Sequence, residues 1–277
     1  MKEIIEILFK VFMFAFVSGS MITLGLGLTT SQLIEPFKNI KMVILSIIAN
    51  FVIVPLFALG MVWVLPVSEG VRIGILLLSI GGGAPFIPKI VETAKGNIAG
   101  AVGLMLLLLI LTMFFMPLVV PLMFPGASVS SWSIARLLFF SMLIPLALAL
   151  FIKARFPDIA TRLQPFFEKL TNFTILVLII IVAYIYTKVI VSNASVLPVI
   201  FIFFLGAMGI GYFTGGKNKS ARIILSVGTG LRNPPVAMLV ASQNFSSEPM
   251  AAITPLLAII IGLSILLPLA KRTGEKT

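Results

Sequence analysis

The sequence contains no cysteine and no histidine among its 277 residues, and charged residues make up only 10% of it. Without cysteine there is no disulfide framework, no thiolate nucleophile and no cysteine-ligated metal site. Without histidine the chain lacks the commonest general base and the commonest metal ligand. These absences argue against an enzyme. We therefore expect no catalytic residue, no metal site and no cofactor.

Apolar residues dominate what is present, with a hydrophobic share of 60% and a mean hydropathy of +1.19. Such a chain has too few polar side chains to cover the surface of a water-soluble globule. The apolar runs are continuous and about 20 residues or longer, which is the length of a membrane-spanning helix. The strands of a membrane barrel are shorter and alternate in polarity. The sequence therefore predicts an all-α membrane protein, with residues 1–277 forming a single transmembrane domain.

Hydrophobic runs between charged or turn-rich breaks predict nine transmembrane helices. Their expected ranges are 4–28, 41–65, 71–94, 97–124, 132–155, 167–191, 194–216, 220–244 and 248–270. The first run is too long for the core of a signal peptide, and Glu3 and Glu6 do not suit a basic leader, so we expect a retained helix. Nine spans place the two termini on opposite sides of the membrane.

The basic residues of the predicted loops are divided unequally between the two sides. The carboxy-terminal side holds Lys38, Lys41, Lys95, Lys153, Arg155, Arg162, Lys169, Lys217, Lys219, Arg222, Lys271, Arg272 and Lys276, whereas the amino-terminal side holds Lys2, Lys10, Arg72, Arg136 and Lys188. Cytoplasmic loops are enriched in lysine and arginine, so we expect the amino terminus outside and the carboxy terminus in the cytoplasm of a cell (inner) membrane protein. Topology and lipid contact explain the net charge of +11, and no nucleic-acid partner is expected.

Two predicted spans, 71–94 and 220–244, are interrupted by glycine and proline and hold the two remaining basic residues, Lys89 and Arg232. The interruptions read GGGAPFIPK at 81–89 and SVGTGLRNPPVAMLV at 226–240. They free backbone polar groups, which a membrane tolerates only where these groups are buried in protein or line a wet cavity. The two broken spans are five spans apart, so they run in opposite directions. This order predicts inverted repeats in which spans 1–4 match spans 6–9, an arrangement typical of transporters.

Several motifs resemble the bile acid:sodium symporter family. They are GGGAP at 81–85, AKGN at Ala94–Asn97, GTGLRN at Gly228–Asn233 and VAMLVASQNF at 236–245. The resemblance implies a fold in which two broken helices cross near the membrane midplane. It implies the nine-helix form, which lacks the first helix of the ten-helix form. It also implies secondary transport.

The sequence departs from this family at the positions that bind sodium. In sodium-coupled members the second crossing reads Glu-x-Gly-x-Gln-Asn, and the resemblance places Gly228 at the glutamate and Arg232 at the glutamine. It places other ligands at positions without a suitable side-chain oxygen: Ile87, Pro88, Gly100 and Leu104. Only Asn50 keeps an oxygen. Because hard cations need oxygen ligands, we expect sodium-independent transport. Sodium coupling through Asn50, Thr229 and backbone carbonyls remains the alternative.

We therefore expect a secondary active or facilitative transporter of organic anions, carboxylates with an apolar body, that works by alternating access. A membrane anion sensor without transport activity is the alternative from another class. The expected partners are a small organic anion and membrane lipid, and the chain is expected to be a monomer. An inside-negative potential favours outward movement of an anion by about 2.3 kcal/mol per charge per 100 mV, so export or facilitated diffusion is the expected direction.

The candidate substrate-binding residues are Arg232, Asn233, Thr229, Lys89, Pro88 and Asn50, and the candidate crossing backbone comprises Gly82, Gly83, Pro85, Gly228, Gly230, Pro234 and Pro235. Arg232 can supply a permanent positive charge, since guanidinium does not titrate in practice. Its structural alternative is pairing with carbonyls freed by the break. Lys89 has an alternative in an ion pair with Glu92, three residues on. Thr229 and Asn233 have one in helix capping.

Overall fold

The structure is a computed structural model that describes residues 2–28, 39–125 and 129–275. Two basic residues counted for topology, Lys38 and Lys276, lie outside the described residues. The described residues are helical apart from short connections, which confirms the predicted all-α class. The helices are α1 (Lys2–Gly27), α3 (Ile40–Ile48), α4 (Val54–Val64), α5 (Glu69–Ile80), α6 (Ile87–Thr93), α7 (Ile98–Met123), α8 (Ser131–Leu138), α9 (Ile144–Arg155), α10 (Pro157–Ser192), α11 (Val196–Thr214), α12 (Lys219–Gly230), α13 (Pro234–Asn244) and α14 (Pro249–Glu275).

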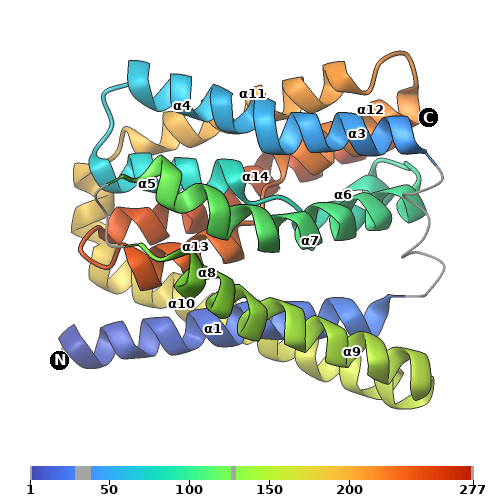
Figure 1. The fold of residues 1–277 in the computed structure, drawn as a ribbon, viewed down its shortest axis with the longest axis horizontal. Coiled ribbons are helices and arrows are strands. Elements are labelled where there is room, and N and C mark those ends of the chain that lie inside the picture. Colours follow the sequence, from blue (N-terminus) through green and yellow to red (C-terminus); the bar gives the residue numbers. More distant parts are fainter. Residues whose placement is uncertain (1, 29–38, 126–128, 276–277) are drawn as a thin grey trace.

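The second and fifth spans each contain a π-helical turn but are not interrupted. The segment η2 (Ala49–Ile53) joins α3 to α4, and η3 (Phe139–Leu143) joins α8 to α9, so each pair forms one continuous span. Within the described residues, eight helical segments are long and apolar enough to cross a membrane. The broken pair α5 and α6 is not among them, but it leads from one end of the molecule to the other (Figure 1). Each of the nine predicted spans therefore has a counterpart.

The sixth span begins about ten residues earlier than predicted, so the expected connection before residue 167 is wrong. Helix α10 starts at Pro157 and continues without interruption to Ser192, a length of 36 residues. At 1.5 Å per residue this is about 54 Å, well beyond a hydrocarbon core of about 30 Å. Charged residues such as Arg162 mark where the apolar run ends, but they do not end a helix. Pro157 fits the first turn, where its missing N–H is not needed.

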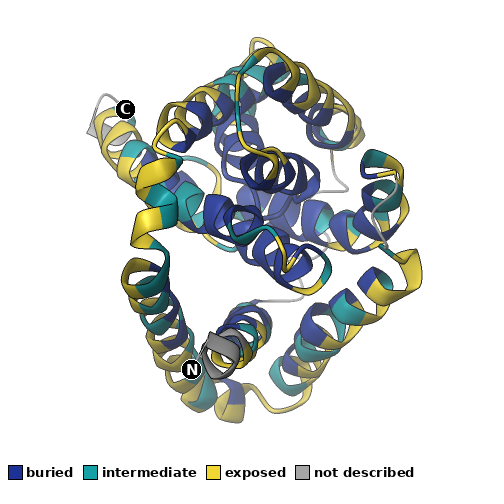
Figure 2. Cartoon of the chain, turned by 90° about the vertical axis from the view of Figure 1, so that its left-hand side faces the viewer, coloured by how far each residue is buried: buried dark blue, intermediate teal, exposed yellow. Residues whose placement is uncertain are grey.

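The helices form two layers of different character (Figure 1). Helix α1, the span of α8 and α9, and α10 pack along one side of the molecule, and we call them the panel. The remaining helices surround the two broken spans, and we call them the core. Burial follows this division, because 94% of the apolar window in residues 219–244 is buried, against 17% of that in α10. Figure 2 shows the buried residues gathered at the centre, with exposed residues on the outer faces.

The direction of the chain confirms the predicted inversion of the two broken spans. From α5 to α6 the chain runs left to right in Figure 1, and from α12 to α13 it runs right to left. The amino and carboxy termini lie at opposite ends, as nine spans require. Helices α1, α5–α6 and α7 thus correspond to α10, α12–α13 and α14 in inverted orientation.

Candidate functional site

The first break is an unwound segment between Ile80 and Ile87 that is held against α7. Gly83 has φ +78°, and a Cβ there would lie 2.3 Å from the backbone nitrogen of Leu109. Only glycine permits both this left-handed conformation and this close approach. The N–H of Gly82 donates to Thr112 Oγ1 at 2.8 Å, which satisfies a backbone donor that the break releases. The predicted crossing residues Gly82, Gly83 and Pro85 therefore lie in the unwound segment.

The second break is shorter than the first and lies within the predicted interruption at 226–240. Helix α12 continues to Gly230, so the candidate crossing residues Gly228 and Gly230 lie in the last turn of the helix that ends at the break. Both permit close packing. A Cβ at Gly230 would lie 2.3 Å from Cγ of Met208, and one at Gly228 would lie 2.7 Å from Cδ2 of Leu104. Glycine is tolerated in the helix because tertiary packing outweighs its low propensity.

Helix α13 restarts at two prolines, Pro234 and Pro235, which occupy its first turn. Proline suits this position, where backbone N–H groups have no partner within the helix. Asn233 caps the helix, because its Oδ1 accepts from the N–H of Val236 at 3.4 Å. The unwound segment thus comprises three residues, 231–233, between the end of α12 at Gly230 and the start of α13 at Pro234.

The two breaks are in direct contact through Asn233, which is completely buried. Its backbone N–H donates to the carbonyl of Gly81 at 2.8 Å. Its side-chain Nδ2 donates to the carbonyls of Gly82 at 3.4 Å and Gly83 at 3.2 Å. One asparagine therefore joins segments about 150 residues apart and satisfies carbonyls that the first break releases.

Arg232 lies beside this contact and is only 3% exposed. Its guanidinium makes five hydrogen bonds, a number that matches its five N–H groups. Nε donates to the carbonyl of Leu78 at 3.1 Å, Nη1 to Asn50 Oδ1 and to the carbonyl of Thr229 at 3.5 Å, and Nη2 to the carbonyls of Asn50 at 3.2 Å and Ser79. Every donor of Arg232 is therefore matched by a protein oxygen in this conformation.

These acceptors show why a cation is stable at this depth. Leu78 and Ser79 belong to the last turn of α5, and Thr229 to the last turn of α12. The carboxyl ends of helices carry partial negative charge and carbonyls without a partner in the helix. All five acceptors are uncharged, and among the described residues no carboxylate forms a salt bridge with Arg232. The crossing therefore keeps a net positive charge.

Asn50 connects Arg232 to the span formed by α3, η2 and α4. It lies in η2 and is completely buried, and its Nδ2 donates to the carbonyl of Ser46 at 2.9 Å and to Thr229 Oγ1 at 3.2 Å. A π-helical turn disturbs the regular backbone ladder, and such turns are frequent at functional sites. Asn50, Thr229 and Arg232 therefore form one buried polar network.

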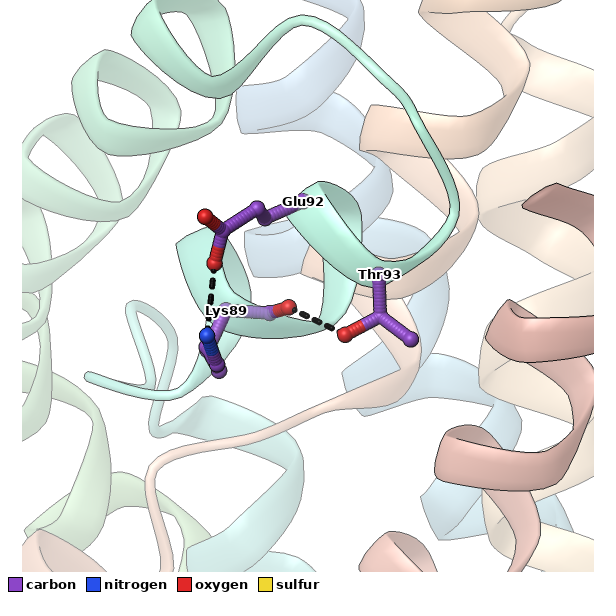
Figure 3. A network of polar contacts seen from close by, with 3 residues as sticks. All are labelled: Lys89, Glu92 and Thr93. Carbon is purple, nitrogen blue, oxygen red and sulfur yellow. Dashed lines mark hydrogen bonds and ion pairs between the residues drawn. The ribbon is translucent and has the colours of Figure 1, made fainter.

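A cavity of about 520 Å³ lies between the panel and the core, beside the first broken span. Its walls come from α1, α6, α7 and α10, and Pro85, Pro88 and Lys89 line it. Lys89 Nζ lies 2.8 Å from Glu92 Oε2, and its carbonyl accepts from Thr93 Oγ1 at 2.9 Å (Figure 3). The predicted alternative of an ion pair within α6 is thus present, and the pair is exposed to the cavity.

A second cavity of about 320 Å³ lies at the opposite end of the molecule, between α1, α10, α13 and α14. The inverted repeat relates these helices to the walls of the first cavity, since α6 corresponds to α13 and α7 to α14. Lys10 and Glu248 line the second cavity, where the first holds Lys89 and Glu92. The panel and the core thus enclose two related cavities, one towards each end.

The structure divides the six candidate substrate-binding residues into two groups. Asn50, Thr229, Arg232 and Asn233 belong to the buried crossing, whereas Pro88 and Lys89 line the larger cavity. Sequence reasoning missed the polar and charged residues that line this cavity from the panel: Ser20, Thr23, Gln164, Glu168, Thr171 and Asn172. The spacing of Ser20 and Thr23 places both on one face of a helix, a signal available in an otherwise apolar span. It also missed Thr112, for which the sequence offers no comparable signal.

One comparison with known proteins places these features in a family. The model of the "Sodium Bile acid symporter family" matches residues 14–193, which is more than half of the 277 residues. The matched part contains most of the panel and all of the first broken span, and Arg232 lies beyond it. No curated protein matches the sequence.

Proposed function

The chain belongs to the sodium bile acid symporter family and is a membrane protein of that transporter type, and from this premise we propose that it carries organic anions without coupling to sodium. The observation that carries the proposal is the burial of Arg232 among five protein oxygens at the crossing of the two broken helices. In this proposal the guanidinium takes the place that a coupling cation occupies in sodium-dependent members.

Electrostatics supports the exclusion of sodium from the crossing. The oxygens suited to a hard cation there, the carbonyls of Asn50 and Thr229 and the amide oxygen of Asn50, already accept from Arg232. A sodium ion 4 Å from the guanidinium would be repelled by about 4 kcal/mol at an effective dielectric constant of about 20. This weakens binding roughly 1,000-fold, since each 1.4 kcal/mol is a factor of about ten.

Packing supports the same conclusion at Gly228, where the resemblance places the family's sodium-binding glutamate. A Cβ at Gly228 would meet Cδ2 of Leu104 at 2.7 Å. Leu104 itself stands near a position where the resemblance places a hydroxyl ligand. An apolar side chain thus fills the space beside a missing carboxylate, and both changes remove oxygens that sodium needs.

The two cavities support transport by alternating access. Each lies between the panel and the core, one at each end, and each is walled by a half-helix that follows a break. Rocking of the panel against the core would open one cavity and close the other, as expected for inverted repeats. The larger cavity combines apolar residues such as Met105 with polar residues such as Asn172, which suits an amphipathic anion.

The charge of the crossing supports an anionic substrate. Arg232 has uncharged acceptors and contributes a positive potential, while the charge of Lys89 in the cavity is paired with Glu92. In our proposal Arg232 acts on the substrate through space, and Lys89 exchanges Glu92 for the anionic group of the substrate. Lys89 then holds the charged end of the substrate near the first break.

The proposed orientation is that of a cell membrane protein with its amino terminus outside, and the proposed functional unit is a monomer. The excess of basic residues at the carboxy-terminal end supports the orientation. Reporter fusions at both termini test it, because only the carboxy-terminal reporter is expected to remain in the cytoplasm. Light scattering of the purified protein tests the monomer.

Uptake into proteoliposomes tests the proposed function. A bile acid, a branched hydroxy acid, a keto acid and a sulfated sterol are offered as radiolabelled anions, with sodium or N-methylglucamine outside. We expect at least one anion to accumulate at the same initial rate in both solutions. Uptake that strictly requires sodium would overturn the sodium-independent part, and binding of an anion without any uptake would favour a sensor.

A further inference from the structure

A third cavity, of about 440 Å³, lies between α11, α12 and α14, away from the boundary between panel and core. It is found at the end of the molecule that carries the carboxy terminus, where α12 begins (Figure 1). Its inner wall is apolar and includes Met208, Val227 and Leu266. A carrier of the proposed kind has no need of this cavity, because it lies outside the path between the panel and the core.

The mouth of this cavity is strongly basic. Lys217, Lys219 and Arg222 line it, and none of its lining residues among the described part of the chain is acidic. Lys217 and Lys219 are exposed, and Arg222 is partly exposed. Lys271 and Arg272 follow the lining residue Ala270 in the last turns of α14 and are also exposed. An apolar cavity thus opens beneath a group of cations that no carboxylate of its lining neutralises.

The position of Arg222 is fixed by the turn between α11 and α12. Its Nε donates to the carbonyl of Gly216, and its Nη1 donates to the hydroxyl of Tyr212 at 3.2 Å. The guanidinium carbon lies 4.9 Å from the centroid of the Tyr212 ring, a cation–π arrangement. Nη2 makes no hydrogen bond with the described residues, so the guanidinium is held in place with donors available for an anion.

The surface beside the cavity is suited to lipid. Tyr212, Phe213 and Leu269 are exposed on α11 and α14, with Phe213 80% exposed. On a membrane protein such apolar side chains face acyl chains, and basic residues just beyond them lie at the level of the lipid phosphates. The cavity therefore meets the bilayer at the depth where apolar and charged parts of a lipid adjoin.

We propose that this cavity binds an anionic phospholipid, with an acyl chain against the apolar wall and the phosphate on Arg222, Lys219 and Lys217. Charge complementarity selects an anionic headgroup over a zwitterionic one, since each cation near the surface is worth about fivefold in affinity. The apolar wall selects a lipid over inorganic phosphate, because a free phosphate gains nothing from Met208, Val227 or Leu266. The inference does not rest on the proposed function, and the site differs from the transport cavities.

Native mass spectrometry of the delipidated full-length protein tests the proposal. Equal amounts of phosphatidylglycerol and phosphatidylcholine are added back, and the bound fraction of each is measured with and without excess inorganic phosphate. We expect one phosphatidylglycerol to be retained at least tenfold over phosphatidylcholine. Inorganic phosphate in excess is expected to displace little of it. Equal retention of the two lipids, or displacement of phosphatidylglycerol by inorganic phosphate, would overturn the lipid site.

Two sets of variants assign the preference to this cavity. The triple variant Lys217→Gln, Lys219→Gln, Arg222→Gln is expected to bind phosphatidylglycerol roughly 100-fold more weakly, or about fivefold for each cation. The control Lys153→Gln, Arg155→Gln removes basic residues of α9 at the same end, outside the cavity lining, and is expected to keep the preference. The variant Ala270→Phe fills the cavity and keeps the cations, and it is expected to lose lipid retention. Unchanged retention in either the triple variant or Ala270→Phe would refute the site.

Discussion

Replacing Arg232 by glutamine removes the positive charge at the crossing and three of its five hydrogen-bond donors. A glutamine amide has two N–H groups, so at least three of the five oxygens on Leu78, Ser79, Asn50 and Thr229 lose their donor. Hydrogen bonds to charged groups contribute about 1.5 kcal/mol or more each. We therefore expect Arg232→Gln to lose about 4.5 kcal/mol of stability, or about 10 °C in Tm.

The same variant is expected to respond to sodium. Without the guanidinium, the crossing presents carbonyl and amide oxygens to an empty space, and these are the ligands that a hard cation prefers. Sodium at 100 times its Kd would restore about 2.7 kcal/mol. Arg232→Lys keeps the charge but has only three donors, so it is expected to be destabilised and to remain insensitive to sodium.

Thermal unfolding of the purified proteins in sodium chloride and in N-methylglucamine chloride checks both effects. The exposed Arg136 provides a matched control, and Arg136→Gln is expected to stay within about 0.5 kcal/mol of wild type. If Arg232→Gln is as stable as wild type, the five hydrogen bonds of Arg232 do not stabilise the crossing. If sodium stabilises wild type and Arg232→Gln equally, the guanidinium does not exclude sodium.

Three further predictions concern the crossing and the larger cavity. Gly83→Ala places a Cβ 2.3 Å from the backbone nitrogen of Leu109 at φ +78°, so we expect it to cost about 3 kcal/mol or more, measured as a fall in Tm or a failure to accumulate. Gly228→Glu together with Leu104→Ser and Arg232→Gln supplies a carboxylate and a hydroxyl, and uptake assays are expected to show sodium dependence that Gly228→Glu alone does not give. Lys89→Gln is expected to raise the KM for anion uptake about tenfold with little change in Tm, because Lys89 is exposed; an unchanged KM would remove it from the site.

Much of the architecture could be predicted because it depends on local sequence. Runs such as IAGAVGLMLLLLILTMFF in α7 have the length and composition of a membrane span, and the clustered glycines and prolines of GGGAP and RNPP disfavour a continuous helix. Counting spans between the two interruptions then gives their relative direction. These predictions need no knowledge of which side chains meet in space.

The partners of Arg232 could not be predicted because they depend on how the two broken spans cross. The carbonyls of Leu78 and Ser79 are more than 150 positions away in the sequence, and no property of these residue types marks them as acceptors. The sequence left two readings open for Arg232, an anion-binding group and a cation paired with freed carbonyls. The contacts found in the structure are those of the second reading.

The larger cavity and the early start of α10 were missed for related reasons. The cavity is lined by residues of α6 and α10, far apart in the sequence, and Asn172 is one of them. Hydropathy does not report which side chains line a space between helices. The first ten residues of α10 are polar enough to lie outside the membrane, and a search for apolar runs passes over them. Pro157 fits the first turn of a helix, but proline is also common in turns, so the residue alone does not mark the start of α10.

Direct binding of radiolabelled sodium to the purified wild-type protein and to Arg232→Gln tests the central claim, that the guanidinium of Arg232 takes the place of a coupling cation. We expect no saturable sodium binding by wild type up to about 100 mM, since repulsion weakens it roughly 1,000-fold. We expect saturable binding by Arg232→Gln. Saturable binding of sodium to wild type with millimolar affinity would show that Arg232 does not replace the cation.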